Sequence, residues 1–253
     1  MSGKLRKNWA WINGLKLNTR LTGIVLLFVM IPVAVLGGIV FYNMEQSSIR
    51  ENVSFMESTM QRRRDSIANN VDSINRTTQF FLSNDTMNQV LIDAATGKEY
   101  TTKEWISIYR TDVAALERLI NNNPVLGGVR VYASNDNVQE MMPVLFNNSR
   151  LRKQEWYSLS SEGGWVFDYT DRLFASSEQT PLLSLITPVN DRQYGNIGVI
   201  EANMKMQTMF PSMYENEEGE SSCFVTDEGR IICGSNHDEI EELEQTASLL
   251  AGI

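Results

Sequence analysis

Hydrophobic residues are spread very unevenly along the start of the chain. Residues 21–42, LTGIVLLFVMIPVAVLGGIVFY, contain no charged residue, and about 20 apolar residues are enough to cross a hydrocarbon core as a helix. A cleaved signal peptide has a shorter apolar region, of about 7–15 residues, followed by a small-residue cleavage site, and GGIVFYNMEQ offers a poor one. We therefore expect a transmembrane helix over residues 21–42.

From residue 43 the apolar positions take up a helical period. No Gly or Pro occurs between Gly38 and Gly97. The pattern predicts a long extracellular helix over residues 43–84, continuous with the membrane span, which needs a partner helix or a domain to pack against. The apolar positions recur mostly at steps of 4 and 3, as in a heptad stripe: Ile49, Val53, Met56, Met60, Ile67, Val71, Ile74 and Phe81.

Beyond residue 85 the pattern changes to short elements. Asp85 is expected to cap the first helix, and Thr101 with Glu104 forms a capping box for the second. Alternating or fully apolar runs that follow are typical of strands, and NDRQY joins the last two runs as a hairpin. Helices followed by an antiparallel sheet of four or five strands predict an α+β fold. The expected helices are 86–95, 101–120, 150–159 and 206–213, and the expected strands are 129–134, 165–169, 182–189 and 195–204.

A second strand–turn–strand, CFVTDEGRIIC, follows an acidic, turn-rich segment, and an acidic helix over residues 238–250 comes after it. A three-residue loop at 227–229 pairs Val225 with Ile231 and Cys223 with Cys233, the only two cysteines. Such cysteines are close enough for a disulfide if they form a non-hydrogen-bonded pair. A two-residue loop would shift the register and separate them, so the disulfide is one of two alternatives.

The sign of the charge changes across the apolar segment at residues 21–42. Residues 1–20 hold five of the 22 basic residues and no acid, which leaves 17 basic against 31 acidic residues in the rest. The positive-inside rule then predicts a cytoplasmic N-terminus in the cell membrane, with residues after about Tyr42 extracellular. An acidic extracellular body argues against nucleic acid as a partner.

The residues that usually carry catalysis are scarce. One histidine, His237, and two cysteines nearly exclude the usual zinc ligand sets, and the chain has no G-x-x-x-x-G-K-[ST] phosphate-binding loop. His237 lies in SNHDEIEE on the expected extracellular side and is expected to be a surface residue. We therefore predict no catalytic residue, no metal and no cofactor in this chain.

Taken together, several segments resemble the N-terminal part of a bacterial sensor histidine kinase. The resemblance is to the Gram-positive, YesM-like group, whose extracellular part is a double Cache domain. It covers nearly the whole chain, and it rests on the order and spacing of its segments more than on any single one. These segments are LKLNTRLTGIVLLFVMIP, NRTTQFFLSND, RKQEWYSLSSEGGWVF, YGNIGVIEANM and CFVTDEGRIICGS.

The resemblance implies two PAS-like lobes in series. Residues 85–213 would be the membrane-distal Cache lobe, and residues 214–253 an incomplete membrane-proximal lobe, in a chain truncated before its kinase part. The full protein would then be a homodimeric histidine kinase that signals across the membrane to a response regulator. The alternatives are the sensor region of a chemotaxis receptor or membrane-anchored transcription regulator, or a membrane-tethered solute-binding protein.

The resemblance also implies a small-molecule site in the distal lobe. An arginine there could clamp a carboxylate, an aspartate could hold an amine, and aromatic faces could stack a sugar. The ligand class therefore stays open among sugars, amino acids and organic acids. The alternative is that Trp156 and Trp165 belong to the core and that the polar residues are surface residues. The candidates are Arg130, Tyr132, Arg152, Trp156, Tyr157, Trp165, Tyr169 and Asp171.

Overall fold

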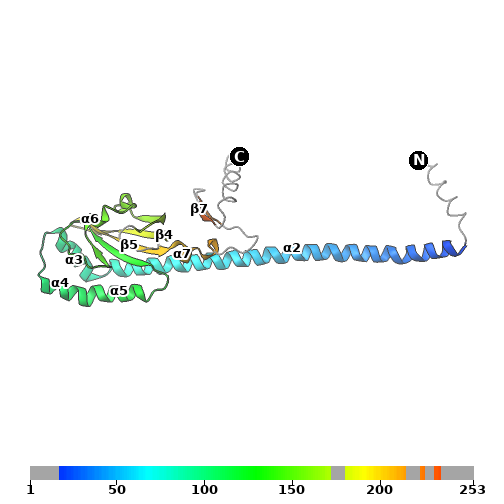
Figure 1. Cartoon of the computed structure of the whole chain (residues 1–253), viewed down its shortest axis with the longest axis horizontal. Coiled ribbons are helices and arrows are strands. Elements are labelled where there is room, and N and C mark those ends of the chain that lie inside the picture. The colour runs from blue at the N-terminus through cyan, green and yellow to red at the C-terminus, as the bar shows by residue number, and fades with distance from the viewer. Residues whose placement is uncertain (1–16, 172–179, 215–222, 226–230, 235–253) are drawn as a thin grey trace. The chain divides into compact units, whose positions relative to one another are not determined.

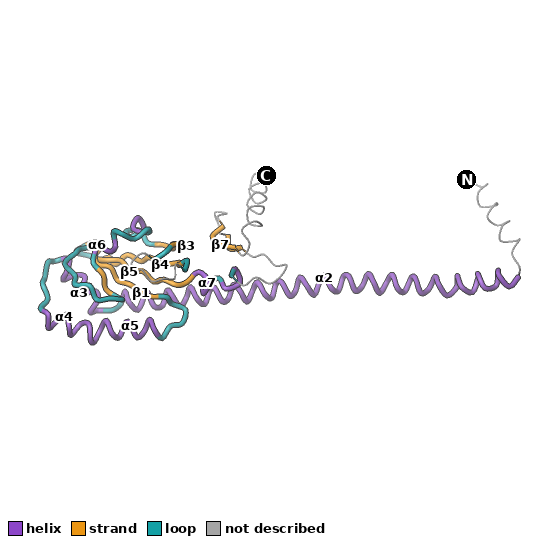
Figure 2. Tube along the Cα trace, viewed as in Figure 1, coloured by secondary structure: helices purple, strands orange, loops and turns teal. Residues whose placement is uncertain are grey.

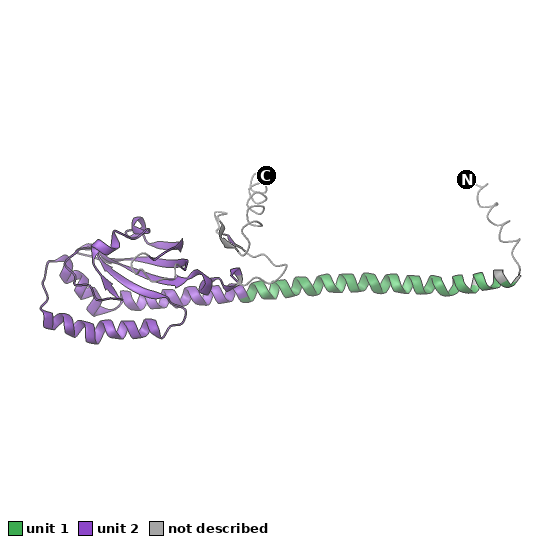
Figure 3. Ribbon diagram, in the orientation of Figure 1, with its two compact units in different colours: residues 1–62 green, residues 63–253 purple. Residues whose placement is uncertain are grey.

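The computed structural model describes residues 17–171, 180–214, 223–225 and 231–234. The acidic helix expected over residues 238–250, His237 and the hairpin loop at 227–229 lie outside these residues. The chain divides into two compact units, residues 1–62 and 63–253 (Figure 3).

The first unit consists of the long helix α2, which runs from Leu17 to Leu82 and so continues into the second unit. The helix confirms the expected continuity, and its end at Leu82 lies close to the expected one. The apolar side chains described at residues 21–23 and 25–42 are exposed, as with Phe28 at 76%. By length and composition this stretch is apolar enough to cross a membrane, with a mean hydropathy of 2.9 in its best window.

Short helices follow the end of α2 in the second unit (Figure 1). Helix α3 is Asp85–Ala95, and its cap is Asn84 in place of the expected Asp85 because Asn84 Oδ1 accepts a bond of 2.8 Å from the Met87 amide. Helix α4, Thr102–Ile108, begins with the expected capping box. The π-helical segment η1, Tyr109–Val113, leads from α4 into α5, Ala114–Asn121.

The helix expected over residues 150–159 is instead two short pieces. They are α6, Asn148–Leu151, and the 3-10 turn η2, Tyr157–Leu159. The Gln154 side chain donates to the Arg150 carbonyl oxygen at 3.2 Å, while the Gln154 amide bonds to Leu151. The side chain thus takes the acceptor that a continuing helix would need.

The sheet has five strands in the order β2-β1-β5-β4-β3 (Figure 2). Four of these strands match the expected ones and pair antiparallel. The sequence did not reveal β2, which has only two residues and pairs parallel to β1. The expectation of a wholly antiparallel sheet was therefore wrong at one edge. The strands are β1 Gly128–Ala133, β2 Leu145–Phe146, β3 Gly164–Tyr169, β4 Leu182–Asp191 and β5 Gly195–Lys205.

The two faces of the sheet pack against different partners. One face, which we call the helix face, packs with the end of α2 and with α3 and α5 through residues such as Ile74, Leu91 and Leu116. Helix α7, Met206–Met209, and the 3-10 turn η3, Pro211–Met213, add methionines to this core. The opposite face, which we call the aromatic face, holds a separate buried cluster: Tyr132, Phe146, Leu151, Trp156, Tyr169, Ile186 and Val199.

The second hairpin consists of β6, Cys223–Val225, and β7, Ile231–Gly234. Val225 pairs with Ile231 as expected, but a bulge follows and Phe224 pairs with Cys233. Because one extra residue on β7 shifts the register, Cys223 lies opposite Gly234, so the expected pairing of the two cysteines was wrong. The disulfide stays a prediction, now between positions offset by one residue.

Candidate ligand-binding site

The aromatic face is built around one buried carboxylate. Glu201 of β5 is 0% exposed and lies between Arg130 of β1 and Ile186 of β4 in the sheet register. Its Oε2 accepts from Tyr132 Oη at 2.8 Å, and its Oε1 accepts from Tyr169 Oη at 2.5 Å. Burial of a carboxylate without such donors would cost several kcal/mol, so the two phenols stabilise Glu201 in place.

Arg130 supplies the positive charge of this cluster. The side chain is buried, and its guanidinium lies between two carboxylates: Nη1 is 3.4 Å from Glu201 Oε2, and Nη2 is bonded to Asp171 Oδ2. Burial acts to lower the pKa of Arg130, but the attraction of Glu201 together with the contributions of Tyr132 and Asp171 outweighs it and raises this pKa above its usual value. The arginine therefore stays charged beside Glu201 and Asp171.

The two tyrosines stay protonated hydrogen-bond donors. Burial, and next the negative charge of Glu201, raises the pKa of both Tyr132 and Tyr169 above the usual value. Ser184 joins the network, since its Oγ lies 2.6 Å from Tyr169 Oη and 3.4 Å from Glu201 Oε1. The cluster thus presents a cation, two anions and three hydroxyl groups on one buried face.

Aromatic rings enclose this cluster on one side. The ring centroids of Trp156 and Tyr132 lie 5.6 Å apart at an interplanar angle of 74°, and Tyr132 stacks on Phe146 at 5.4 Å. Two buried donors near this face, Trp156 Nε1 and Asn203 Nδ2, have no hydrogen-bond partner among the described residues. Unpaired buried donors are costly, so these two N–H groups are suited to donate to an oxygen of a ligand or of water.

A polar pocket of about 230 Å³ adjoins the aromatic cluster. Leu151 and Val199 line it and also belong to that cluster, which links the two. Arg152 and Tyr157, both expected at a ligand site, line this pocket rather than contact Glu201. Its other lining groups are hydroxyls and amides, so the pocket offers one positive charge and several hydrogen-bonding groups.

The eight candidate residues therefore divide into three sets. Arg130, Tyr132 and Tyr169 contact Glu201, and Asp171 joins them through Arg130. Trp156 lies against Tyr132, and Arg152 and Tyr157 line the adjoining pocket. The remaining one lies elsewhere.

Trp165 is on the helix face of the sheet. It pairs with Leu185, stacks on Phe167 at 6.3 Å and packs against the first core, because alternation along β3 turns it away from Glu201. This position agrees with the alternative that Trp165 is a core residue.

Sequence reasoning missed Glu201 itself and Ser184. The signal for Glu201 was present, because GNIGVIEANM is an apolar central strand with a single acid in it. A lone charge in such a strand needs partners, and these come from β1, β3 and β4. Among the residues that the structure describes, no group of three His, Cys, Asp or Glu side chains could hold a metal ion.

Comparisons with known proteins gave structural neighbours only. No protein-family model and no curated protein matches the sequence. Among solved structures, the chain is similar to the ligand-binding domain of the Campylobacter jejuni chemoreceptor Tlp3 in complex with L-valine, at 15% identity and a TM-score of 0.39, over 74% of this chain and 75% of that one.

Two further structures are similar at the same level. The Tlp3 sensory domain with isoleucine bound has 16% identity and a TM-score of 0.38, over 74% of this chain and 75% of that one. The ligand-binding domain of the Pseudomonas aeruginosa amino acid chemoreceptor PctC in complex with GABA has 16% identity and a TM-score of 0.35, over 66% of this chain and 69% of that one.

Proposed function

We propose that this chain is the small-molecule-sensing input part of a membrane-anchored signalling protein. The observation that carries the proposal is the pairing of opposite charges on the buried aromatic face, where Arg130 lies beside Glu201 and Asp171. Buried charges that are not needed for folding are costly, and they cluster at binding sites. The ligand is bound at this face of the lobe formed by residues 85–213, the proposed membrane-distal Cache lobe.

The charge pattern favours an amino acid or a related amine among the three ligand classes. An α-amino acid carries a cation and an anion a few ångströms apart, so its carboxylate matches Arg130 and its ammonium matches Glu201 or Asp171. A dicarboxylic acid has no cationic group that would match Glu201 or Asp171, and a sugar has no charged group to match any of the three. Sugars and organic acids are therefore the less favoured ligands.

The adjoining pocket would take the rest of the ligand. It contacts the aromatic cluster through Leu151 and Val199, and its 230 Å³ is enough for a side chain of several heavy atoms. Arg152 and Tyr157 would then contact the side chain of the ligand rather than its charged ends. We therefore expect Arg152 and Tyr157 to set ligand preference and Glu201 to set affinity for the amine.

Signalling requires the membrane helix and a partner. In this proposal residues 21–42 span the cell membrane with the N-terminus cytoplasmic, and a second copy of the chain pairs along α2. Ligand binding would shift the lobe against the end of α2, and the paired helices would carry the displacement across the membrane. This helix has exposed apolar residues that suit such pairing: Ile49, Val53, Met56 and Met60.

The cytoplasmic output domain determines which class of signalling protein this is. We infer a cytoplasmic histidine kinase that acts on a response regulator, as the YesM-like resemblance implies. A chemotaxis receptor, a membrane-anchored transcription regulator or a membrane-tethered solute-binding protein would use the same input. The coding sequence beyond Ile253 distinguishes these outputs, because a kinase requires a phosphoacceptor helix and an ATP-binding domain there.

A thermal-shift screen tests the sensing function. The full chain in lipid nanodiscs is heated with amino acids, amines, sugars and dicarboxylic acids, and a ligand that binds the folded state raises the unfolding midpoint. We expect hits among the amino acids and amines that Glu201→Gln abolishes. The exposed carboxylate variant Glu162→Gln is the control and should keep them. Hits confined to sugars or dicarboxylic acids, or hits that survive Glu201→Gln, would refute the proposed site.

A further inference from the structure

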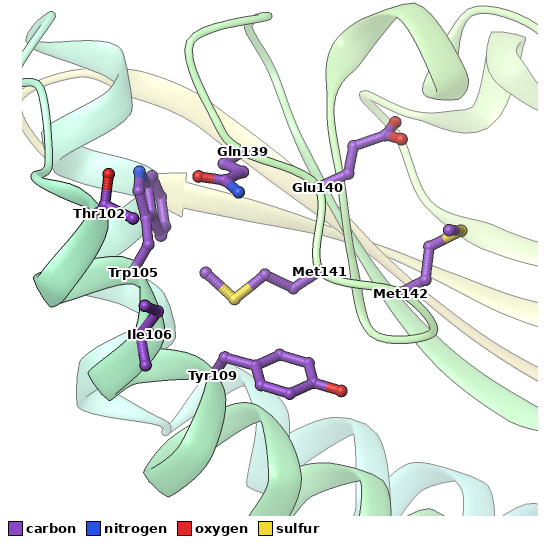
Figure 4. A pocket seen from close by; sticks show the side chains of 8 residues that line it. All are labelled: Thr102, Trp105, Ile106, Tyr109, Gln139, Glu140, Met141 and Met142. Atoms are coloured by element: carbon purple, nitrogen blue, oxygen red, sulfur yellow. The ribbon is translucent and has the colours of Figure 1, made fainter.

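A second pocket lies away from the Glu201 cluster, between helix α4 and the chain that leads into β2 (Figure 4). Its volume is about 320 Å³. Trp105, Ile106 and Tyr109 form one wall, and Glu140, Met141 and Met142 form the other. None of these residues belongs to the candidate site described above.

The first wall is the uncovered face of α4. The capping box fixes the start of this helix, so positions 105, 106 and 109 fall on one side at helical spacing. No residue of α4 is buried, and Ile106 and Tyr109 are 53% and 45% exposed. Trp105 is held against Tyr100 with ring centroids 4.7 Å apart. Trp105 is thus partly buried against the first core, while Ile106 and Tyr109 beside it remain exposed.

The second wall supplies a methionine floor and a polar rim. Met141 is 6% exposed and is tied to Leu145 by a backbone bridge, whereas Met142 is 54% exposed. Figure 4 shows the Met141 side chain extending toward Trp105 and Ile106, with the Glu140 carboxylate pointing away from them. Glu140 Oε1 is 3.1 Å from Arg150 Nε, so its charge is already compensated. The rest of the lining is uncharged and mostly apolar, with Thr102 and Gln139 as its neutral polar side chains.

We propose that this pocket is a second ligand site, which takes a small, uncharged molecule with an apolar ring. A ligand pocket measures about 300–1,000 Å³, so this one suits a ligand of one or two rings. Aromatic faces and thioethers are the groups that favour ring contacts. Because the Glu140 carboxylate is paired with Arg150, this pocket favours a neutral ligand over a zwitterion. It therefore differs from the Glu201 cluster both in position and in the kind of ligand it would bind.

The surroundings favour a small molecule over a protein. The residues beside the pocket on α4 and η1 are exposed and polar or charged, as with Lys103, Ser107 and Arg110. A stable protein interface buries about 800 Å² on each partner around an apolar centre. The apolar area here ends at the rim of the pocket, so it is large enough for a ring but not for a protein.

The segment after the pocket reaches α2. Tyr109 begins the π-helical η1, and π-helical turns are frequent at functional sites. Helix α5 then buries Leu116 in the first core, and just beyond it Asn123 Nδ2 donates to Ser73 Oγ of α2 at 2.9 Å. A ligand at Tyr109 is thus placed at one end of a continuous segment whose other end contacts α2.

Methionine-methyl NMR with indole as the probe tests the proposal. The full chain in lipid nanodiscs carries ¹³C-methyl methionine, and the Met141 and Met142 signals are assigned by substitution. Indole should shift both signals in a saturable way. Tyr109→Ala should weaken the apparent affinity about tenfold, the equivalent of one aromatic contact. Tyr194→Ala, which removes a ring of similar exposure on the β4–β5 turn, should leave the affinity unchanged.

Three outcomes would overturn the proposal. The first is the absence of saturable shifts with indole, and the second is equal shifts in wild type and Tyr109→Ala. The third is a change from dimer to monomer in Ile106→Glu, because the pocket would then be an interface between two copies of the chain. The site is independent of the proposed amine site, so indole binding should persist in Glu201→Gln. If amines fail to bind at Glu201, the indole experiment still tests the second site. If indole fails to bind, the thermal-shift screen still tests the Glu201 site.

Discussion

Glu201 and Arg130 face each other across β5 and β1, and Arg130 Nη1 lies 3.4 Å from Glu201 Oε2 on the buried aromatic face. Neither strand needs these charges in order to pair, because backbone bonds hold the register. An ion pair buried in this way is weak evidence for stability, since the loss of hydration offsets much of the attraction. In the proposed function this pair, beside Tyr132 and Trp156, recognises the ligand.

The phenol donors should make a measurable contribution to stability. Tyr132→Phe and Tyr169→Phe each remove one bond to Glu201 and leave a buried carboxylate with one donor fewer. Each variant should lower the free energy of unfolding by about 1–3 kcal/mol. Urea denaturation of the full chain in nanodiscs measures the free energy of unfolding of each variant. Tyr194→Phe is the exposed control, and equal stability of all three variants would contradict the network described here.

Asp93 should make stability depend on pH. It accepts from Lys98 Nζ at 2.6 Å, Tyr100 Oη at 2.5 Å and Gln89 Nε2 at 2.7 Å. Burial alone would raise the pKa of Asp93, but these bonds outweigh it and the pKa lies below its ordinary value of 3.8. The carboxylate therefore stabilises the fold above the unfolded-state pKa, and this contribution is lost as pH falls through the lower folded-state pKa.

The matching variant is Asp93→Asn. It should be less stable than wild type by about 1–3 kcal/mol near pH 7. The gap should stay constant down to about pH 5 and shrink below pH 4, since the wild-type carboxylate then becomes protonated. If the stability difference between wild type and Asp93→Asn grew on acidification, the pKa of Asp93 would not be lowered by folding.

The proposed membrane orientation can be read from cysteine labelling in intact cells. In a background where both natural cysteines are changed to serine, Ser47→Cys should react with a membrane-impermeant maleimide. Ser2→Cys should react only after the cells are permeabilised, because the positive-inside rule places the N-terminus in the cytoplasm. The opposite pattern would reverse the proposed topology.

The apolar stripe of α2 predicts where two copies meet. Val53 is on the stripe and is 49% exposed, and Glu51 is an exposed position off the stripe. In the same cysteine-free background, Val53→Cys should form a disulfide-linked dimer under mild oxidation far faster than Glu51→Cys, because only stripe positions face the partner. Equal cross-linking at the two positions would argue against a homodimer paired along this stripe.

The sequence revealed the strongly periodic elements and missed those set by tertiary contacts. The long helix, the Thr101 capping box and the β4–β5 hairpin follow from local patterns. Strand β2 has two residues and depends on pairing with β1, which no local pattern reports. At the break after α6, the amides of Lys153 and Gln154 bond three residues back, and the Gln154 side chain bonds to the Arg150 carbonyl oxygen.

The candidate site could be predicted only in part, because strand pairing decides which of its residues lie on one face. Arg130, Tyr132, Tyr169 and Asp171 were expected together, and they do meet. Trp165 was expected with them, but strand alternation places it on the helix face. The pairing of β1, β5, β4 and β3 decides which residues share a face, and Glu201 becomes the centre only once that order is known.

The most direct test of the central claim compares an amino acid with its deaminated analogue. For the strongest amino acid found in the screen, calorimetry measures the Kd of that amino acid and of the 2-hydroxy acid with the same side chain. The account predicts that loss of the ammonium weakens binding at least about tenfold in wild type, the worth of one charged hydrogen bond. In Glu201→Gln the difference should nearly disappear. Equal affinity of the two compounds for the wild-type chain would contradict the claim that Glu201 recognises an amine.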